Sequence, residues 1–190
     1  MTDSAKRPST SDEVTPATDQ GSAHMGRGLN PVQLDYLTRP LDERRVKFAN
    51  GQSHVEAWDV RRWLNRIFGF GGWSYATDMV LVREIEITPQ APNGRSRWTV
   101  IYRAKCRLEV RDPQGNPLAF FEEFAAGDSA NQPALGDAHD NAMKTAESQA
   151  LKRCAVNLGD QFGLSLYANG TTQAVVQRTL DHAPAPAPSA

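Results

Sequence analysis

The chain has 190 residues, and its 21 Lys and Arg are balanced by 22 Asp and Glu, which gives a net charge of -1. This length suits one domain with tails, and the balanced charge excludes a general attraction to nucleic acids or to membranes. Any site for a polyanion must therefore come from cations that are gathered locally. No apolar run approaches the roughly 20 residues that span a bilayer, and the N-terminus lacks the apolar core of a signal peptide. We therefore expect a cytoplasmic protein without a membrane partner.

Both ends of the chain have the composition of disordered tails. Residues 1–28 are rich in Ser, Thr, Asp, Pro and Gly and hold few large apolar side chains. Such a segment cannot bury enough surface to offset the entropy that it would lose on ordering. Residues 169–190 end in "APAPAPSA", which predicts a second disordered tail that is extended where proline dominates. The folded part is then one domain over residues 29–168.

The first strong signal inside this domain is the segment "WDVRRWLNRIFG". Between residues 60 and 68, apolar side chains recur at helical spacing and form one stripe, with arginines on the other side. Gly69 follows as a C-terminal stop. Capping-box spacing between Ser53 and Glu56 would start the helix early, whereas "SHVE" as a short extended segment would start it near Ala57. We favour the start near Ala57.

Three segments rich in β-formers follow, over residues 71–87, 97–110 and 118–126. Turn sequences, "TPQAPNGRS" and "DPQGNP", separate them, which predicts an antiparallel meander of three strands. In the second segment, apolar side chains alternate with a cationic row. Cross-strand pairing with Glu84, Glu86 or Glu122 is the ordinary explanation of that row, and a groove for a polyanion is the alternative. The row consists of Arg97, Arg103, Lys105 and Arg107.

A second helix is predicted over residues 135–158. Its apolar stripe consists mostly of small side chains, which permit close packing against a sheet or another helix. The polar side carries Lys144 and Lys152, with Arg153 next to the latter. These last two cations either compensate the helix dipole or face something negative. The order of helix, three strands and helix predicts the α+β class, with an antiparallel β-meander packed on helices.

Residues with catalytic or metal-binding chemistry are few. Asp137, His139 and Asp140 include suitable metal ligands, but acidic residues at a helix start are also explained by the helix dipole. The glycines of "GFGGW" follow a helix and precede a strand, which reverses the dinucleotide fingerprint. Cys106 and Cys154 lie in apolar contexts and are predicted to be buried free thiols rather than a disulfide. We expect no catalytic residue, no metal and no cofactor.

Four blocks of the sequence carry a resemblance to a known family. They are "LDERRVKFANGQ", "DVRRWLNRIFGFGGWS", "YRAKCRLEV" and "GDAHDNAMKTAESQALKRCAVNLGDQFGLSLY". Together they resemble the annealing domain of the Rad fifty-two family of single-strand annealing proteins, of bacterial or phage type. The resemblance implies a β-β-β-α core flanked by helices, and subunits that assemble into a closed ring or an arc. It also implies that single-stranded DNA lies in a positively charged groove, with its backbone inward and its bases outward.

What the resemblance implies for function is annealing of complementary strands without ATP, in homologous recombination and double-strand break repair. The family's inner groove maps onto Arg45, Lys152 and Arg153. A further arginine of the family falls on Val156 or Asn157, which lowers the charge expected here. The secondary candidates for DNA contact are Arg97, Arg103 and Lys144.

The residues themselves leave other functions open. The cationic strand would also suit an RNA or double-stranded nucleic-acid binding module. Asp137, His139 and Asp140 would be the ligands of a metal-dependent nuclease, and a structural oligomer is a third option. The expected partners are single-stranded DNA and further copies of the chain, with a recombinase or a single-strand binding protein as candidates. A cytoplasmic, nucleoid-associated location follows from the resemblance.

Overall fold

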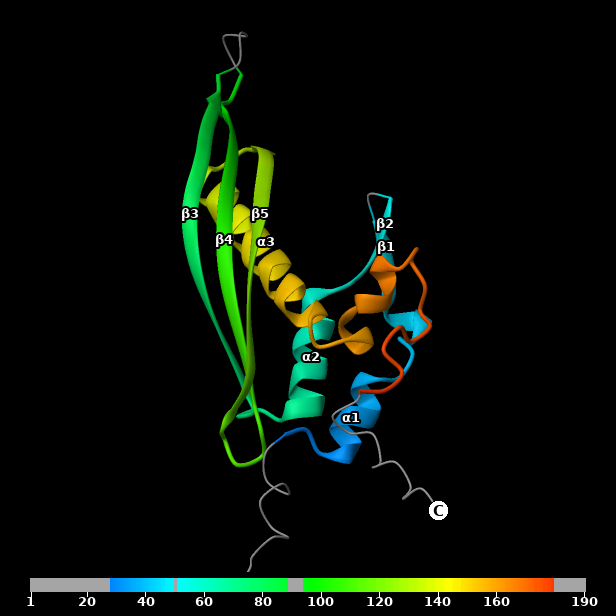
Figure 1. Cartoon of the computed structure of the whole chain (residues 1–190). Helices are drawn as coiled ribbons and strands as arrows, with labels where there is room; N and C mark the ends of the chain where they lie inside the picture. The colour runs from blue at the N-terminus through cyan, green and yellow to red at the C-terminus, as the bar shows by residue number, and fades with distance from the viewer. Residues whose placement is uncertain (1–27, 50, 89–93, 180–190) are drawn as a thin grey trace, which may run out of the picture.

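The structure, a computed structural model, describes residues 28–49, 51–88 and 94–179. Figure 1 shows a long sheet on one side, the β1–β2 hairpin with α1 and the C-terminal segment on the other, and α2 and α3 between them. This arrangement confirms the α+β class, and the order β3–β4–β5–α3 is the implied core. The elements are α1 (Pro31–Leu37), η1 (Glu43–Arg45), β1 (Val46–Ala49), β2 (Gln52–Val55), α2 (Ala57–Phe68), β3 (Trp73–Ile87), β4 (Arg97–Arg111), β5 (Pro117–Gln132), α3 (Leu135–Val156), η2 (Asp160–Phe162) and η3 (Leu164–Tyr167).

Helix α2 confirms the start predicted near Ala57. Because "SHVE" begins within β2, the capping-box alternative is wrong, and no side chain caps the helix. Four side chains of the apolar stripe are buried, of which Val60 and Leu64 are fully enclosed, and Trp63 is partly buried. The chain leaves the helix at Gly69, where φ is 81°, a conformation that favours glycine. Burial of the stripe fixes α2 beside α3.

The predicted meander is confirmed as a sheet in the order β3–β4–β5, with both pairings antiparallel. The even-numbered side chains of β4 from Val100 to Val110 face the core, and the cationic row faces outward. Strand β5 is longer than predicted, because it runs on to Gln132 through small and polar residues. Those residues are not strong β-formers, but their backbone pairs with β4, as Ser129 does with Val100.

Helix α3 packs against the sheet through the predicted stripe of small side chains. Its alanines at positions 138, 142, 146 and 150 are fully buried. On the sheet, Gly127 lies directly under the helix: a Cβ there would lie 2.2 Å from the backbone nitrogen of Ala146. Small residues on both sides therefore set the short helix–sheet distance. The helix ends at Val156, two residues before the predicted end.

The segment after η3 lies against the N-terminal part of the domain. The Leu41 backbone N–H donates to the Thr172 carbonyl at 2.8 Å. Asp160 Oδ2 accepts from the backbone N–H groups of Val175 and Val176, each at 3.1 Å. Residues 169–179, which belong to the predicted C-terminal tail, therefore contact the domain. The predicted tail over residues 1–28 lies outside the described residues except for Gly28, as do residues 180–190.

Two further sequence predictions concern membranes and cysteines. Within the described part of the chain, none of the helices is both long and apolar enough to cross a bilayer. Cys106 and Cys154 are buried free thiols, as predicted. The thiol of Cys154 donates to the Cys106 carbonyl at 3.3 Å, which adds to the contact between α3 and β4. Both side chains are core residues of the helix–sheet contact.

Candidate nucleic-acid interface

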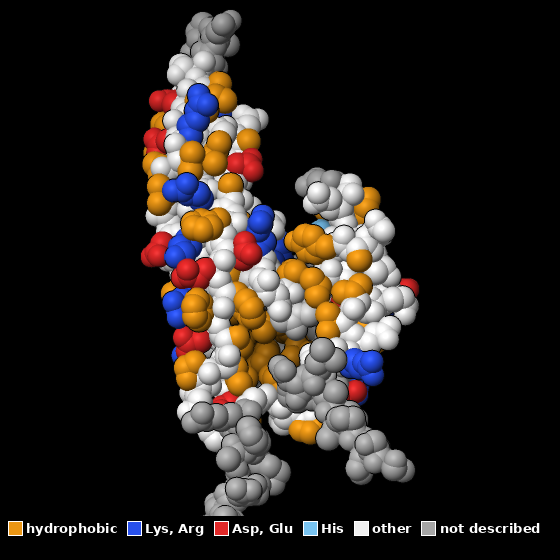
Figure 2. Space-filling view, in the orientation of Figure 1, with side chains coloured by type: hydrophobic (Ala, Val, Ile, Leu, Met, Phe, Trp, Pro, Cys, Tyr) orange, Lys and Arg blue, Asp and Glu red, His pale blue; other side chains and the backbone are white. Residues whose placement is uncertain are grey.

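A cleft of about 530 Å³ opens between α3 and the β1–β2 hairpin, with η2 and η3 contributing the remaining walls. Figure 2 shows it as a hollow, with Lys and Arg side chains toward the sheet and α3 and hydrophobic side chains on the opposite lobe. The cations of the cleft come from α3, and the aromatic side chains come from the hairpin, η2 and η3. Its lining includes Phe48, His54, Lys152, Arg153, Phe162 and Tyr167.

Lys152 is the cation of this cleft with the least compensation. Its side chain is half-buried, and within residues 28–49, 51–88 and 94–179 its ammonium has no ion-pair or hydrogen-bond partner. Burial lowers the pKa of the Lys152 ammonium below its ordinary value, and the negative charge of Glu56 opposes the shift. An ammonium that has lost hydration without gaining a direct ion pair is stabilised when an anion arrives. Lys152 is therefore prepared to bind an anionic group.

Arg153 lies beside Lys152 and lines the same cleft. Its side chain is exposed, and its Nε atom lies 3.7 Å from Glu123 Oε2. An exposed ion pair with this separation contributes little energy, so Arg153 can exchange its partner for a phosphate at small cost. The two predicted inner-groove cations of α3 are thus brought together on one wall. The helix-dipole explanation also holds for both, because they lie near the end of α3.

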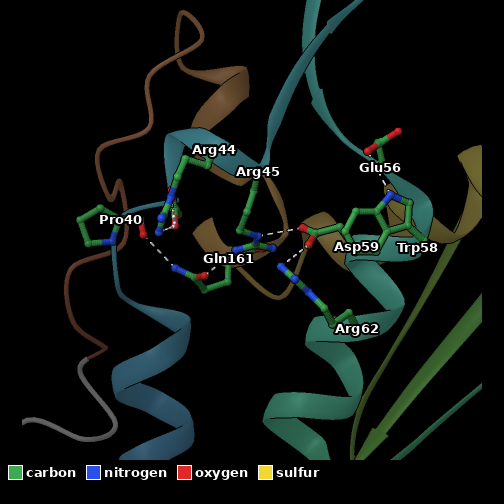
Figure 3. Close-up of polar contacts among 9 residues, drawn as sticks. Pro40, Arg44, Arg45, Glu56, Trp58, Asp59, Arg62 and Gln161 are labelled. Atoms are coloured by element: carbon green, nitrogen blue, oxygen red, sulfur yellow. Dashed lines mark hydrogen bonds and ion pairs between the residues drawn. The ribbon is translucent and has the colours of Figure 1, made fainter.

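Arg45, the third predicted inner-groove residue, lies outside the lining of the cleft and is buried. Its Nε donates to Asp59 Oδ2 at 2.8 Å, and its other nitrogens donate to the side chain and backbone oxygens of Gln161, both at 2.7 Å. Figure 3 shows this network, in which Arg62 also contacts Asp59. Burial lowers the pKa of Arg45, and Asp59 opposes that shift. The guanidinium therefore links η1, α2 and η2, and phosphate contact by Arg45 stays a prediction.

The secondary candidates are scattered rather than gathered. Arg97 donates to the Asn131 carbonyl at 3.4 Å at the far end of the sheet, Arg103 is exposed on β4, and Lys144 pairs with Asp140 on α3. Not one of them lines the cleft. Their contact with DNA stays a prediction.

Cross-strand pairing accounts for two members of the cationic row. Lys105 Nζ lies 3.0 Å from Glu122 Oε2, and Arg107 lies 3.9 Å from the other oxygen of the same carboxylate. These pairs cross between β4 and β5, as one of the two explanations predicted. The outer face of the sheet is therefore less positive than the row suggests.

The metal hypothesis gains no support from the geometry. His139 has both ring nitrogens occupied: Nε2 lies 2.8 Å from Glu84 Oε2, and Nδ1 lies 2.9 Å from the Tyr102 hydroxyl. Asp140 pairs with Lys144. Across the described residues, no three His, Cys, Asp or Glu side chains gather in a way that would hold a metal ion. Asp137 and Asp140 therefore keep their explanation as helix-start residues.

The aromatic side chains of the cleft were missed by the sequence analysis. Phe48 and Tyr167 belong to the sequence blocks that carry the family resemblance. Neither lies in a periodic pattern of apolar and polar residues from which its exposure could be predicted. The hairpin that carries Phe48 had a signal in the sequence, the dipeptide Asn-Gly at positions 50 and 51. The grouping of the two aromatics with Lys152 arises only in the tertiary structure.

Comparison with known proteins supplies an independent finding. Residues 33–184 match the sequence model of the "Rad52/22 family double-strand break repair protein". The chain is 26% identical over 151 residues to the DNA repair and recombination protein RAD52 of Kluyveromyces lactis, which covers 78% of this chain and 32% of that protein. It is 27% identical over 158 residues to the DNA repair and recombination protein rad22 of Schizosaccharomyces pombe, with 78% and 31% covered.

A shorter match links the chain to the DNA repair protein RAD59 of Eremothecium gossypii, at 29% identity over 95 residues, covering 49% of this chain and 44% of that protein. The chain spans about a third of the length of the RAD52 and rad22 relatives. The bacterial or phage type expected from the sequence is not borne out, because these relatives come from fungi.

Proposed function

Since this chain belongs to the Rad52/22 family of double-strand break repair proteins, we propose that it binds single-stranded DNA in the cleft beside α3 and anneals complementary strands. The observation that carries the proposal is the half-buried side chain of Lys152, which lies beside Arg153 and whose ammonium has no ion-pair partner within the described residues. Annealing exchanges hydrogen bonds between bases and needs no covalent step. ATP, a metal or another cofactor is therefore not required for it.

Contact with phosphate suits an annealing protein. Lys and Arg bind the backbone of any sequence, because phosphates carry no sequence information. A strand that is held by its phosphates keeps the Watson–Crick edges of its bases available to a second strand. A cleft whose cations come from a single helix wall favours this orientation, since the backbone turns toward α3.

Assembly into a ring or an arc is part of the proposal, because two cations per subunit make a weak site. Repetition of the cleft would join these cations into a continuous track on a nearly neutral protein. The sheet supports assembly in two ways: β3 and β5 are edge strands, and several of their large apolar side chains are exposed. These exposed side chains are Val80, Leu81, Val82, Phe120 and Phe124. A recombinase or a single-strand binding protein stays a predicted partner.

The test is the salt dependence of binding to a labelled single strand, measured by fluorescence anisotropy. The double variant Lys152→Ala with Arg153→Ala is expected to bind weakly, and the slope of log affinity against log salt falls by about 0.7 for each lost phosphate contact. The matched control removes two other cations, Arg39 and Arg44, which are exposed, paired with Asp35 and Asp42, and outside the cleft. This control should bind as the wild type does.

Several outcomes would overturn the proposal. One is an unchanged affinity and salt slope in the double variant when light scattering shows an intact assembly. Another is stronger competition by duplex DNA or RNA than by unlabelled single-stranded DNA. That result would favour the alternative function, an RNA or double-stranded nucleic-acid binding module. A third is failure of the wild type to accelerate annealing of two complementary oligonucleotides. In that case the protein would bind single-stranded DNA but would not anneal it.

A further inference from the structure

We propose that the cleft holds nucleobases as well as phosphates, through the exposed rings of Phe48 and Tyr167. This inference rests on the proposed function and adds a second kind of contact to it. Phe48 extends from β1 in the hairpin wall, and Tyr167 is the last residue of η3. Both line the same cleft as Lys152 and Arg153. One nucleotide can therefore meet a cation through its phosphate and a ring through its base.

The exposure of these rings is the first argument. Phe48 is 75% exposed and Tyr167 is 74% exposed, whereas Phe162, which lines the same cleft, is fully buried. The fold therefore buries one aromatic ring of the cleft and leaves two open to solvent. An aromatic ring that stays in water gives up the free energy that its burial would supply. A bound planar, apolar surface would cover both rings and recover that energy.

The size and charge of the cleft are the second argument. A volume of about 530 Å³ falls within the range of about 300–1,000 Å³ that is typical of small-molecule sites. This is more room than a phosphate alone needs. The cations lie on the α3 wall, and Phe48 lies on the hairpin across from it. A strand with its backbone against α3 would direct bases toward the rings.

Stacking agrees with annealing, because a ring covers the face of a base and leaves its Watson–Crick edge free. Every base has such a face, so stacking tolerates any sequence. The rings would limit rotation of the bases, while the Watson–Crick edges of the bases stay free. The cleft would then present an ordered strand to its complement, which phosphate contact alone does not do.

A second protein copy is the other possible occupant of exposed aromatic rings. The charge of the cleft argues against an apolar protein surface, since such a surface packed on Phe48 and Tyr167 would bury the ammonium of Lys152 further without bringing a negative charge. Burial of an unpaired charge is strongly unfavourable. A nucleic acid brings its own negative charge to the same place and avoids this penalty.

The experiment compares two labelled probes of equal length, an oligothymidylate and an abasic strand with the same sugar-phosphate backbone. Phe48→Ala and Tyr167→Ala are each expected to weaken binding of oligothymidylate by about fivefold or more, with no change for the abasic strand. The salt slope should stay the same, because no phosphate contact is lost. Tyr167→Phe keeps the ring and should bind as the wild type does. Phe70→Ala is the matched control, because Phe70 is 89% exposed and lies outside the cleft.

The two probes separate failure of this inference from failure of the proposed function. Equal losses on both probes, or a changed oligomer mass, would mean that the rings act in assembly and would overturn the inference. Unchanged binding in both alanine variants would overturn it too, while the proposed function stands. If Lys152→Ala with Arg153→Ala also binds normally, the proposed function itself fails. A base such as 2-aminopurine in the probe gives an independent readout, because stacking on a ring quenches its fluorescence.

Discussion

The short distance between α3 and the sheet leads to a prediction about one methyl group. In Gly127→Ala, the added Cβ would lie 2.2 Å from the Ala146 nitrogen and 2.6 Å from the Ala142 oxygen. Ordinary contacts begin near 3.4 Å, so α3 would have to move away by roughly 1 Å. Both neighbouring atoms belong to the helix backbone and cannot rotate aside. The residue has an ordinary strand conformation, so the penalty comes from packing and not from φ.

Overpacking of a well-filled core costs about 1–3 kcal/mol. Because the clash involves backbone atoms in the middle of the alanine stripe, we expect the upper end, about 3 kcal/mol. For a domain of this size each kcal/mol lowers the melting temperature by about 2–4 °C, so Gly127→Ala should melt about 10 °C below the wild type. Differential scanning calorimetry at a fixed protein concentration measures this, since assembly would make the melting temperature depend on concentration.

Gly136→Ala is the matched control, because it makes the same substitution within α3. A Cβ at Gly136 meets no atom within 4 Å. Alanine favours a helix over glycine by up to about 1 kcal/mol, so this variant should melt at the wild-type temperature or slightly above it. The packing argument is refuted if the two variants melt alike, or if Gly127→Ala melts within about 2 °C of the wild type.

Two further predictions concern the cations. Arg45→Ala leaves Asp59 buried with Arg62 as its remaining partner, which should lower the free energy of unfolding in urea by about 3 kcal/mol. Arg44→Ala, at the exposed neighbour, should change it by less than about 0.5 kcal/mol, and equal effects would contradict the assigned burial. Because burial lowers the pKa of Lys152 from 10.5, affinity for single-stranded DNA should fall as the pH rises from neutral toward about 10, whereas Lys152→Arg should keep it. The free energy of unfolding of the wild type should rise over the same window, since the unfolded chain holds more protons on this lysine. The binding prediction is refuted if the wild type and Lys152→Arg show the same dependence of DNA affinity on pH.

Periodicity was sufficient to predict the long elements of the fold and insufficient for the short ones. Helix α2 and strand β4 bury one regular face, and their side chains repeat at the spacing that the face requires. Strands β1 and β2 have four residues each, which is too short to establish a period. The end of β5 was missed for a different reason. Its small and polar residues form a strand because β4 supplies backbone partners and α3 covers them, and neither is visible in the local sequence.

The candidate site shows the same division. Lys152 and Arg153 were predicted, through a motif together with their place near the end of a helix. Of the adjacent arginines of "ERRVK", Arg45 was assigned to phosphate contact, but its burial was not predicted: Arg44 extends into solvent, and Arg45 is buried against Asp59. The distinction depends on Gln161, which lies 116 positions further along the chain. Contacts with residues distant in the sequence decide which arginine is buried. Such contacts cannot be read from a single sequence where no periodic pattern indicates a buried face.

The buried position of Arg45 allows it to link the chain segments that form the cleft. Its guanidinium joins η1, which leads into the hairpin, to η2, which follows α3. The hairpin carries Phe48, and α3 carries Lys152, so this network connects the segments that adjoin the two walls of the cleft. A buried cation that is hydrogen-bonded through all three of its nitrogens has a defined geometry, because displacement would leave buried charges unpaired. Arg45 thus supports the elements that form the cleft, and its substitution should weaken DNA binding through the loss of this geometry, in addition to any effect of the predicted phosphate contact.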